Sequence, residues 1–529
     1  MDLCDLTAFE ISRVLRSREV SALEVTESCL ERIQSVDGAP GHINCADNKS
    51  DDGKVHAFIN PTPEMAYKQA RAVDKKFAMG EDLSPLAGIP FSVKDIFCVR
   101  ETLTTAASRI LANFTAPYTA TPVERMINAG GVMIGKVNLD EFTFGSSSES
   151  SAFQPSPRNP WDTSRVPGGS SGGSAASVAA GEAFLSLGTD TAGSIRQPAA
   201  FCGVVGMKPT YGRVSRYGLI AFGSSLDCPG PLARSAEDVA LMMNVIAGAD
   251  INDATAANTP VPDYLQSLNK GIHGMRIGIS PDFFKITYPN SEKGDYSQQP
   301  LSEEMLKAVM GVAEIYRALG AEIIEDVPMP NTKYGIPAFF VISRVEAASN
   351  LHRFDGVKYG YRTNASVKEL KDMYRRSRGE AFGLQPKLRI LMGMYVSAAQ
   401  YSQQYYQRAL RVRTLIRRDF EQVFDPDGKY RLDALLTPTT PTTAFSIQAV
   451  FGDSVMMQYA DQLTVTANHA GIPGISFPAG FDKAGLPIGV QLLGADFSEA
   501  LLLRLVHAYE KATADAEWRK RKPAVLEEA

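Results

Sequence analysis

Between about residues 85 and 230, short stretches of β-type residues alternate with helical or glycine- and serine-rich segments. The β-type stretches are GIPFSVKD, GVMIGKV, AFLSLG and GVVGMKP, and small-residue helical sequence such as AASVAAG lies between them. This alternation is typical of an α/β domain, in which helices cover a central sheet. The length of 529 residues would by itself suggest three or four domains, but no repeat and no convincing linker divides the chain.

Helical sequences flank this alternating region on both sides. Two helices are expected within residues 5–36, and each opens with a capping box, formed by Thr7 with Glu10 and by Ser21 with Glu24. The other expected elements are a polar loop at 38–54, a helix at about 63–78, a second loop at 285–302, a helix at about 302–319, a mostly helical segment rich in Arg and Tyr at about 350–425, and a last helix at about 497–513.

Composition and charge limit the class of protein. Hydrophobic residues make up 44% and charged residues 21%, and the formal net charge is −5. These values fit a folded soluble protein better than one whose whole surface binds nucleic acid or membrane. No run of about 18 apolar residues is present, and the acidic N-terminus does not resemble a signal peptide, so we expect a cytoplasmic protein. The six histidines and six cysteines are scattered without metal-binding spacing, so neither a metal nor another cofactor is expected.

Two loops rich in small residues lie within the alternating region. Residues 168–174 read GGSSGGS, and residues 189–198 read TDTAGSIRQP directly after the AFLSLG stretch. Loops of this kind let backbone N–H groups approach a ligand or a developing anion. A strand that ends in a small-residue turn at Ser194 has the geometry of an oxyanion hole. A tight turn and a flexible glycine loop are the alternative explanation.

A serine nucleophile needs a base, and no histidine lies in this region. The stretch GIPFSVKD offers Lys94 instead, because alternation along a strand puts Lys94 on the face opposite to Phe91 and Val93. Burial would disfavour the charged form of Lys94 and lower its pKa, and a neutral amine can act as a general base in Ser–Lys pairs. The alternative is a lysine that extends its amine to solvent or is ion-paired, for example with Asp95.

The segments GIPFSVKD, GGSSGGSAA and GTDTAGSIRQPAAFCGVVGMKPTYGRVS together resemble the amidase signature family. They occur in the order of that family, and Ser170 and Ser194 have its spacing of 24 residues. The likeness is specific over about residues 80–230 and continues more loosely to the C-terminus. It implies an α/β fold with one large α/β/α domain over residues 1–529 and a central mixed sheet covered by helices. In that fold the segment at about 350–425 would shape the substrate pocket.

The resemblance also assigns roles to matching residues. Ser194 would be the nucleophile and Lys94 the general base, while Ser170, after a cis peptide bond, would relay the proton between them. Ser171 would assist this relay. The implied activity is that of a serine amidohydrolase, which cleaves amide-type C–N bonds through an acyl-enzyme on Ser194. The oxyanion of the tetrahedral intermediate would be held by the backbone N–H groups of Thr191, Ala192, Gly193 and Ser194.

Within the family, the chain most resembles the glutamine-hydrolysing subunits of tRNA-dependent amidotransferases, which pass ammonia to a partner subunit. The stretches EAASNLHRFDGVKYGYR, GMKPTYGRVSRYGLIAFGSSLDCPGP and ANHAGIPGISFPAG carry this likeness. Arg389 and Asp461 match the arginine and aspartate that hold glutamine there. Under this interpretation tRNA and other subunits would be partners. The basic, Tyr-containing run from His352 to Arg389 would face them, or it would be a solvated helical face.

Several positions depart from that subfamily. Ala192 replaces a glycine, His469 replaces a leucine, residues 385–389 form a divergent basic stretch, and Phe339 and Phe340 stand where a tyrosine pair is expected. Losing hydroxyls that bind a polar ligand lowers selectivity for it, and aromatic side chains favour bulky apolar amides. We therefore expect a stand-alone hydrolase of small-molecule amides, anilides or carbamates, monomeric or homodimeric, without nucleic acid or membrane partners. The alternative is the glutamine-hydrolysing subunit.

Overall fold

Eleven strands form one mixed sheet in the part of the chain that the computed structural model describes, namely residues 2–43, 51, 53–290, 295–451, 453, 457 and 459–527. Their bounds are β1 Phe58–Pro61, β2 Pro90–Lys94, β3 Val132–Val137, β4 Leu185–Asp190, β5 Val205–Lys208, β6 Cys228–Ala233, β7 Arg276–Ile279, β10 Glu322–Ile324, β11 Ala434–Pro438, β12 Gly474–Phe481 and β13 Pro487–Leu493. They lie in the order β1-β3-β2-β4-β6-β5-β12-β13-β11-β7-β10, with both parallel and antiparallel neighbours.

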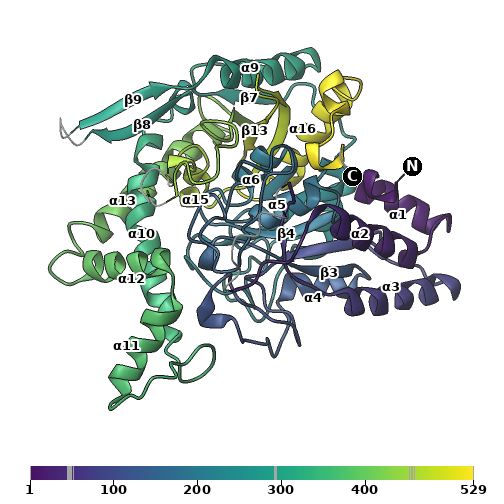
Figure 1. Cartoon of the computed structure of the whole chain (residues 1–529). Coiled ribbons are helices and arrows are strands. Elements are labelled where there is room, and N and C mark those ends of the chain that lie inside the picture. Colours follow the sequence, from purple (N-terminus) through teal and green to yellow (C-terminus); the bar gives the residue numbers. More distant parts are fainter. Residues whose placement is uncertain are drawn as a thin grey trace.

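Helices surround this sheet (Figure 1). The α-helices are α1 Ala8–Arg16, α2 Ala22–Val36, α3 Pro63–Ala78, α4 Thr121–Asn128, α5 Gly172–Ala179, α6 Arg196–Cys202, α7 Ala236–Ile246, α8 Tyr264–Ser267, α9 Glu303–Ala318, α10 Gly335–Asn350, α11 Leu370–Ala381, α12 Leu384–Ser397, α13 Tyr406–Phe424, α15 Val465–Ala470 and α16 Glu499–Ala512. The structure confirms the predicted α/β fold with a central mixed sheet covered by helices.

The two N-terminal helices begin as their capping boxes predict. The Glu10 N–H donates to the Thr7 hydroxyl at 3.2 Å, and the Thr7 N–H donates to the Glu10 carboxylate at 2.8 Å. Ser21 and Glu24 make the same reciprocal pair at the start of α2. Each pair satisfies backbone donors that a helix end otherwise leaves without a partner.

Residues 285–302, which we expected to form a loop, contain an antiparallel hairpin of β8 (Lys285–Asn290) and β9 (Asp295–Pro300). The expectation was wrong because the segment is polar and contains prolines, so it lacks the apolar alternation of a strand that packs on a core. Its order comes instead from backbone pairing across the hairpin, and the Thr287 N–H also donates to the Gln462 side chain at 3.1 Å. Of the other predicted loop, at 38–54, residues 44–50 and 52 lie outside the described residues.

The helical segment that follows residue 350 lies at one side of the molecule. α11 and α12 are on the opposite side from α1, α2 and α3 (Figure 1), and both α12 and α13 pack on α10. The mostly helical segment predicted at 350–425 is therefore present. Among the residues that the structure describes, no helix is both long enough and apolar enough to cross a membrane.

Candidate active site

Strand direction brings the predicted site residues to one edge of the sheet. β2 and β4 are parallel neighbours, with Val93 opposite Leu187, so their carboxyl ends lie side by side. Lys94 is the last residue of β2, and Asp190 is the last residue of β4, directly before the predicted oxyanion turn. The glycine–serine loop reaches the same edge, because α5 begins at Gly172 and packs on both strands.

The Lys94 side chain lies among three hydroxyl groups. Its Nζ donates to Ser170 Oγ and Ser171 Oγ, each at 2.8 Å, and to Thr189 Oγ1 at 2.9 Å. Lys94 is fully buried, and alternation along β2 also brings Ser92 to this face, where it bonds Ser186 on β4 at 2.8 Å. The predicted base, relay serine and assisting serine are therefore in contact.

Lys94 does not form the alternative ion pair with Asp95. Asp95 points to the other face of β2 and accepts a hydrogen bond from Lys136 Nζ at 2.7 Å. Burial lowers the pKa of Lys94 to about 7, although nearby carboxylates oppose this shift. A large fraction of the amine is then neutral near pH 7, as a general base requires. The opposing carboxylates are those of Asp140, Asp190 and Asp227.

The glycine–serine loop is tightly enclosed at Gly169. A Cβ at this position would lie 2.2 Å from Asp140 Oδ2 and 2.7 Å from the Ser147 nitrogen, so only glycine fits. The peptide bond between Gly169 and Ser170 is cis. Ser171 joins the loop to the turn that follows β4, because its backbone N–H donates to the Ser194 carbonyl at 3.2 Å.

The turn after β4 keeps the four predicted backbone donors available. Within the described part of the chain, the N–H groups of Thr191, Ala192, Gly193 and Ser194 donate to no other residue. The next two N–H groups, of Ile195 and Arg196, instead bond Asp190 Oδ2 at 3.3 and 3.4 Å. Unused, adjacent N–H groups beside a buried serine are what an oxyanion hole requires.

The Ser194 side chain belongs to this turn and is nearly buried, at 4% exposure. In the described residues, no hydrogen bond joins its hydroxyl to that of Ser170, while Ser170 accepts one from Lys94. The structure thus brings the three predicted catalytic residues to one place and forms the Lys94–Ser170 contact. The Ser170–Ser194 contact would have to form in the loaded site, where catalytic hydrogen bonds commonly shorten.

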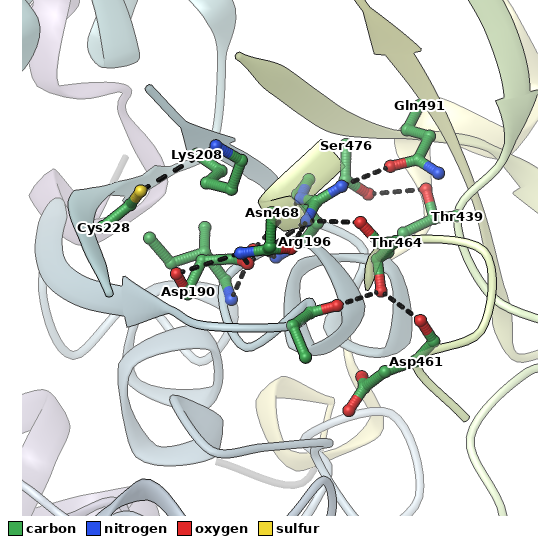
Figure 2. Close-up of polar contacts among 12 residues, drawn as sticks. Asp190, Arg196, Lys208, Cys228, Thr439, Asp461, Thr464, Asn468, Ser476 and Gln491 are labelled. Carbon is green, nitrogen blue, oxygen red and sulfur yellow. Dashed lines mark hydrogen bonds and ion pairs between the residues drawn. The ribbon is translucent and has the colours of Figure 1, made fainter. Parts of the chain in front are cut away.

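A network of buried polar side chains joins the residues on both sides of the turn to the C-terminal part of the chain (Figure 2). Arg196 pairs with Asp190 at 3.0 Å and donates to the side chains of Asn468 at 2.8 Å and Gln491 at 3.0 Å. Asn468 in turn donates to Asp190 Oδ1 at 2.8 Å. Burial alone would raise the pKa of Asp190, but the Arg196 charge and these hydrogen bonds lower it. The carboxylate therefore stays ionised and pairs with Arg196 across the turn.

Asp461 approaches the same turn from the C-terminal half of the chain. A Cβ on Gly193, whose φ is 156°, would lie 2.8 Å from Asp461 Oδ1 and 2.2 Å from Thr464 Oγ1. Ser146 donates to Asp461 Oδ2 at 2.6 Å, and burial raises the pKa of Asp461 to about 8. Asp461 is therefore next to the oxyanion turn, as expected for a substrate-binding residue.

A row of aromatic rings connects Arg389 with Phe339 and His469. The Arg389 guanidinium lies 4.8 Å from the centre of the Phe144 ring, which packs on Phe222 with ring centres 4.5 Å apart. Phe222 packs on Phe339 at 6.2 Å, and Phe339 lies 6.5 Å from His469. Burial lowers the pKa of His469 to about 4, so this end of the row is uncharged at neutral pH.

Phe340, which the sequence pairs with Phe339, points elsewhere. Its ring lies beneath the guanidinium of Arg344 at 3.5 Å. The two adjacent phenylalanines therefore contact different groups. The contact of Phe340 with Arg344 does not by itself bring Phe340 to Lys94, so its predicted place in the substrate pocket stays a prediction.

Several residues around the site were not singled out from the sequence. Thr189 and Arg196 lie inside the quoted GTDTAGSIRQP segment, and their alternation and charge could have suggested a role. Asn468 lies inside the quoted stretch ANHAGIPGISFPAG, whereas Thr464 carries no local signal, because it meets the turn only after more than 260 intervening residues. Asp140, which accepts the Ser148 N–H at 2.8 Å, was likewise found only in the structure.

Comparisons with known proteins place the chain in a family. The family model described as Amidase matches residues 44–503. The chain is 47% identical to the A subunit of the glutamyl-tRNA(Gln) amidotransferase of Carboxydothermus hydrogenoformans, over 99% of this chain and 100% of the relative.

Solved structures show the same fold. The A subunit of the glutamyl-tRNA(Gln) amidotransferase of Thermotoga maritima has a TM-score of 0.74 and 36% identity, covering 97% of this chain and 95% of that one. The native peptide amidase of Stenotrophomonas maltophilia has a TM-score of 0.74 and 30% identity, with 98% of both chains covered. The likeness thus includes both one component of an amidotransferase and a peptide amidase.

Proposed function

The chain belongs to the amidase family, and we propose that it hydrolyses the side-chain amide of glutamine as one component of a tRNA-dependent amidotransferase. The observation that carries this proposal is the 47% identity to the A subunit of such an enzyme, over nearly the full length of both chains. The ammonia released from glutamine would pass to a partner subunit. The sequence left this function open as the alternative, and the comparisons favour it over a stand-alone hydrolase.

The proposed chemistry begins with a proton relay. Neutral Lys94 takes a proton from Ser170 as Ser170 takes one from Ser194, whose oxygen forms a bond to the amide carbon. The negative charge that develops on the carbonyl oxygen is held by the backbone N–H groups of the turn, and one such donor is typically worth about 3–4 kcal/mol. The relay then runs backwards, protonates the leaving nitrogen and releases ammonia. Water hydrolyses the acyl-enzyme and regenerates Ser194.

The polar residues beside the site support a small, charged substrate. Arg389 is buried and would bind a carboxylate, while Asp461 lies next to the oxyanion turn and would bind an ammonium group. Asp461 has a pKa raised to about 8 by burial in this structure. An ammonium group placed beside it would lower that pKa and ionise the carboxyl. The α-carboxylate and α-amine of glutamine offer this pair of charges.

A stand-alone amide hydrolase is the second candidate. One observation favours it: Phe339 packs on Phe222 in a row of aromatic rings, and this row ends at the neutral His469. Such a surface suits an aryl or alkyl group better than an amino acid. The solved structure of a protein described as a peptide amidase has the same fold as this chain. The comparisons do not support a carbamate substrate.

The test is to purify the chain alone and to co-express it with candidate partner subunits, then assay glutamine and an aryl amide. The proposal predicts glutamine hydrolysis that depends on, or rises strongly with, the partner subunits. Rapid aryl-amide turnover by the isolated chain, with glutamine ignored in every preparation, would instead establish the second candidate. Ser194→Ala should abolish acyl-enzyme formation under either substrate assignment, and Ser225→Ala is a matched control away from the relay.

A further inference from the structure

The Thr464 hydroxyl makes a hydrogen bond to the backbone of the oxyanion turn. Thr464 lies immediately before α15 and is fully buried. Its Oγ1 donates to the Ala192 carbonyl at 2.7 Å and also lies 3.0 Å from the Asp461 carbonyl (Figure 2). A side chain from the C-terminal part of the chain thus touches the peptide group that the proposed oxyanion hole uses.

This hydrogen bond determines where the Gly193 N–H points. The Ala192 carbonyl and the Gly193 N–H belong to one planar peptide group, in which the two bonds point in opposite directions. Because the carbonyl is held towards Thr464, the N–H is held on the side away from Thr464. There it donates to no other residue of the described chain.

Thr464 is itself fixed by the network behind the turn. Its backbone carbonyl accepts a hydrogen bond from Arg196 Nη2 at 2.9 Å. Arg196 begins α6, on one side of the turn, and pairs with Asp190, at the end of β4 on the other side. Thr464 therefore contacts the middle of the turn through its side chain and one flank of the turn, Arg196, through its main chain.

Neighbouring atoms leave the peptide little freedom to rotate. A Cβ added at Gly193 would lie 2.2 Å from Thr464 Oγ1, so the hydroxyl is packed directly against the glycine. Rotation of the peptide would break the 2.7 Å bond and leave the Ala192 carbonyl without its hydroxyl partner, while the Thr464 hydroxyl would keep only the Asp461 carbonyl at 3.0 Å. The contact thus selects one orientation of the Ala192–Gly193 peptide.

We propose that Thr464 is a positioning residue of the oxyanion hole, which orients the Ala192–Gly193 peptide so that the Gly193 N–H faces the oxyanion formed on attack by Ser194. Thr464 touches no reacting atom and transfers no proton. The inference rests on the proposed function, because it takes Ser194 as the nucleophile.

Thr464→Val tests this proposal, because valine keeps the shape of threonine and removes only the hydroxyl. Losing one oriented donor lowers kcat by about 100- to 1,000-fold, and Thr464→Val, which misdirects the donor and does not remove it, should lower kcat at least about tenfold. KM should change by less than about threefold because the ground-state amide does not depend on this donor. Thr464→Ser keeps the hydroxyl and should recover most of the lost rate. Thr466→Val is the matched control, since the buried Thr466 hydroxyl has no hydrogen-bond partner in the described chain.

A second readout does not depend on knowing the amide. An alkyl fluorophosphonate reacts with an activated serine: the Ser194 oxygen bonds to phosphorus, fluoride leaves, and the relay takes up the serine proton. The phosphoryl oxygen then carries the charge that the turn must hold. The pseudo-first-order labelling rate, read by peptide mass spectrometry, should fall at least about tenfold in Thr464→Val and stay within about twofold in Thr466→Val.

Two results would overturn the inference: a Thr464→Val variant with unchanged kcat and labelling rate, or a loss of both that Thr464→Ser does not recover. Its failure can be separated from failure of the proposed function. If Ser194→Ala keeps turnover and labelling, the nucleophile assignment is wrong. If Ser194→Ala loses both and Thr464→Val loses neither, only the role of Thr464 is wrong.

Discussion

At the scale of single residues, burial and hydroxyl neighbours define the chemistry of Lys94. The amine has three hydroxyl acceptors and no direct carboxylate partner among the described residues, because Asp95 is bound to Lys136. Desolvation therefore lowers the pKa of Lys94 to about 7. A lysine on a strand is usually charged and solvated, whereas the buried Lys94 is partly neutral near pH 7, as the proposed role of general base requires.

The pH dependence of activity should report this pKa. Below about pH 7 Lys94 is protonated and cannot accept the Ser170 proton, so kcat/KM should rise about tenfold per pH unit at low pH and level off above about pH 7. The measurement is kcat/KM from pH 5 to 9. A profile that is flat across this range would argue against lysine as the base.

Substituting Gly193 should affect catalysis more than folding. A Cβ there would lie 2.2 Å from Thr464 Oγ1, so Gly193→Ala should displace the turn and lower kcat by at least about 100-fold, comparable to the loss of an oxyanion donor. Gly311→Ala on α9 is the matched control, because nothing lies within 4 Å of its added Cβ. The control should keep full activity and gain about 0.5–1 kcal/mol of stability, measured by urea unfolding.

Among the helices, strands and turns, local sequence patterns predict where some elements begin, whereas contacts between distant residues order the turn at Ser194. The helix starts at Thr7 and Ser21 follow from reciprocal bonds over three residues, and GIPFSVKD forms a strand, as its pattern predicts. By contrast, the turn at Ser194 is held by Thr464, 272 residues beyond Ala192. No local pattern indicates such a contact, because its partners are neighbours only after the sheet has formed. The hairpin at 285–300 could not be predicted for a related reason: backbone hydrogen bonds between its two strands order it, and these leave no pattern of apolar side chains in the sequence.

A buried carboxyl pair connects α2 to the loop between α5 and β4, and it should make stability depend on pH. Burial raises the pKa of Asp37 to about 7 and that of Glu182 well above its ordinary value. A carboxyl with a raised folded-state pKa stabilises the fold at low pH, and this contribution is lost as pH rises through about 7. Unfolding free energy should therefore fall between pH 5 and pH 8.

Glu182→Gln isolates this effect, because the amide does not ionise. The variant should be more stable than the parent at pH 8, by about 1–3 kcal/mol, and should differ little at pH 5. Urea unfolding at both pH values measures it, and the exposed Glu27→Gln on α2 serves as control. Equal pH slopes for parent and Glu182→Gln would contradict the assignment.

At the scale of the whole molecule, one hydrogen-bonded sheet joins the first and last thirds of the chain. β1 to β4 lie at one end, β11 and β13 near the other, and β12 pairs with β5 in between. The chain ends also meet, because Lys522 donates to Asp5 at 2.8 Å. These links are expected of the single domain that the resemblance implies.

A chain joined in this way should unfold in one transition. The two tryptophans, Trp161 and Trp518, both pack on Phe481, so their fluorescence reports one local region, while far-UV circular dichroism reports all helices and strands. We expect the two signals to follow the same urea curve. Two separated transitions would show that the chain contains independent domains.

The fold class and the family could be predicted from the amino-acid sequence, and the same patterns proposed Lys94, Ser170 and Ser194 as the catalytic residues. These predictions depend on the alternation of β-type and helical stretches, on small residues in loops and on the spacing of Ser170 and Ser194, which are all properties of the sequence alone. Three contacts became visible only in the folded chain: Asp95 pairs with Lys136, the Phe340 ring packs on Arg344, and Thr464 bonds the Ala192 carbonyl. The physical reason is that burial, pKa and hydrogen-bond partners are properties of a packed neighbourhood, and its members are distant in sequence.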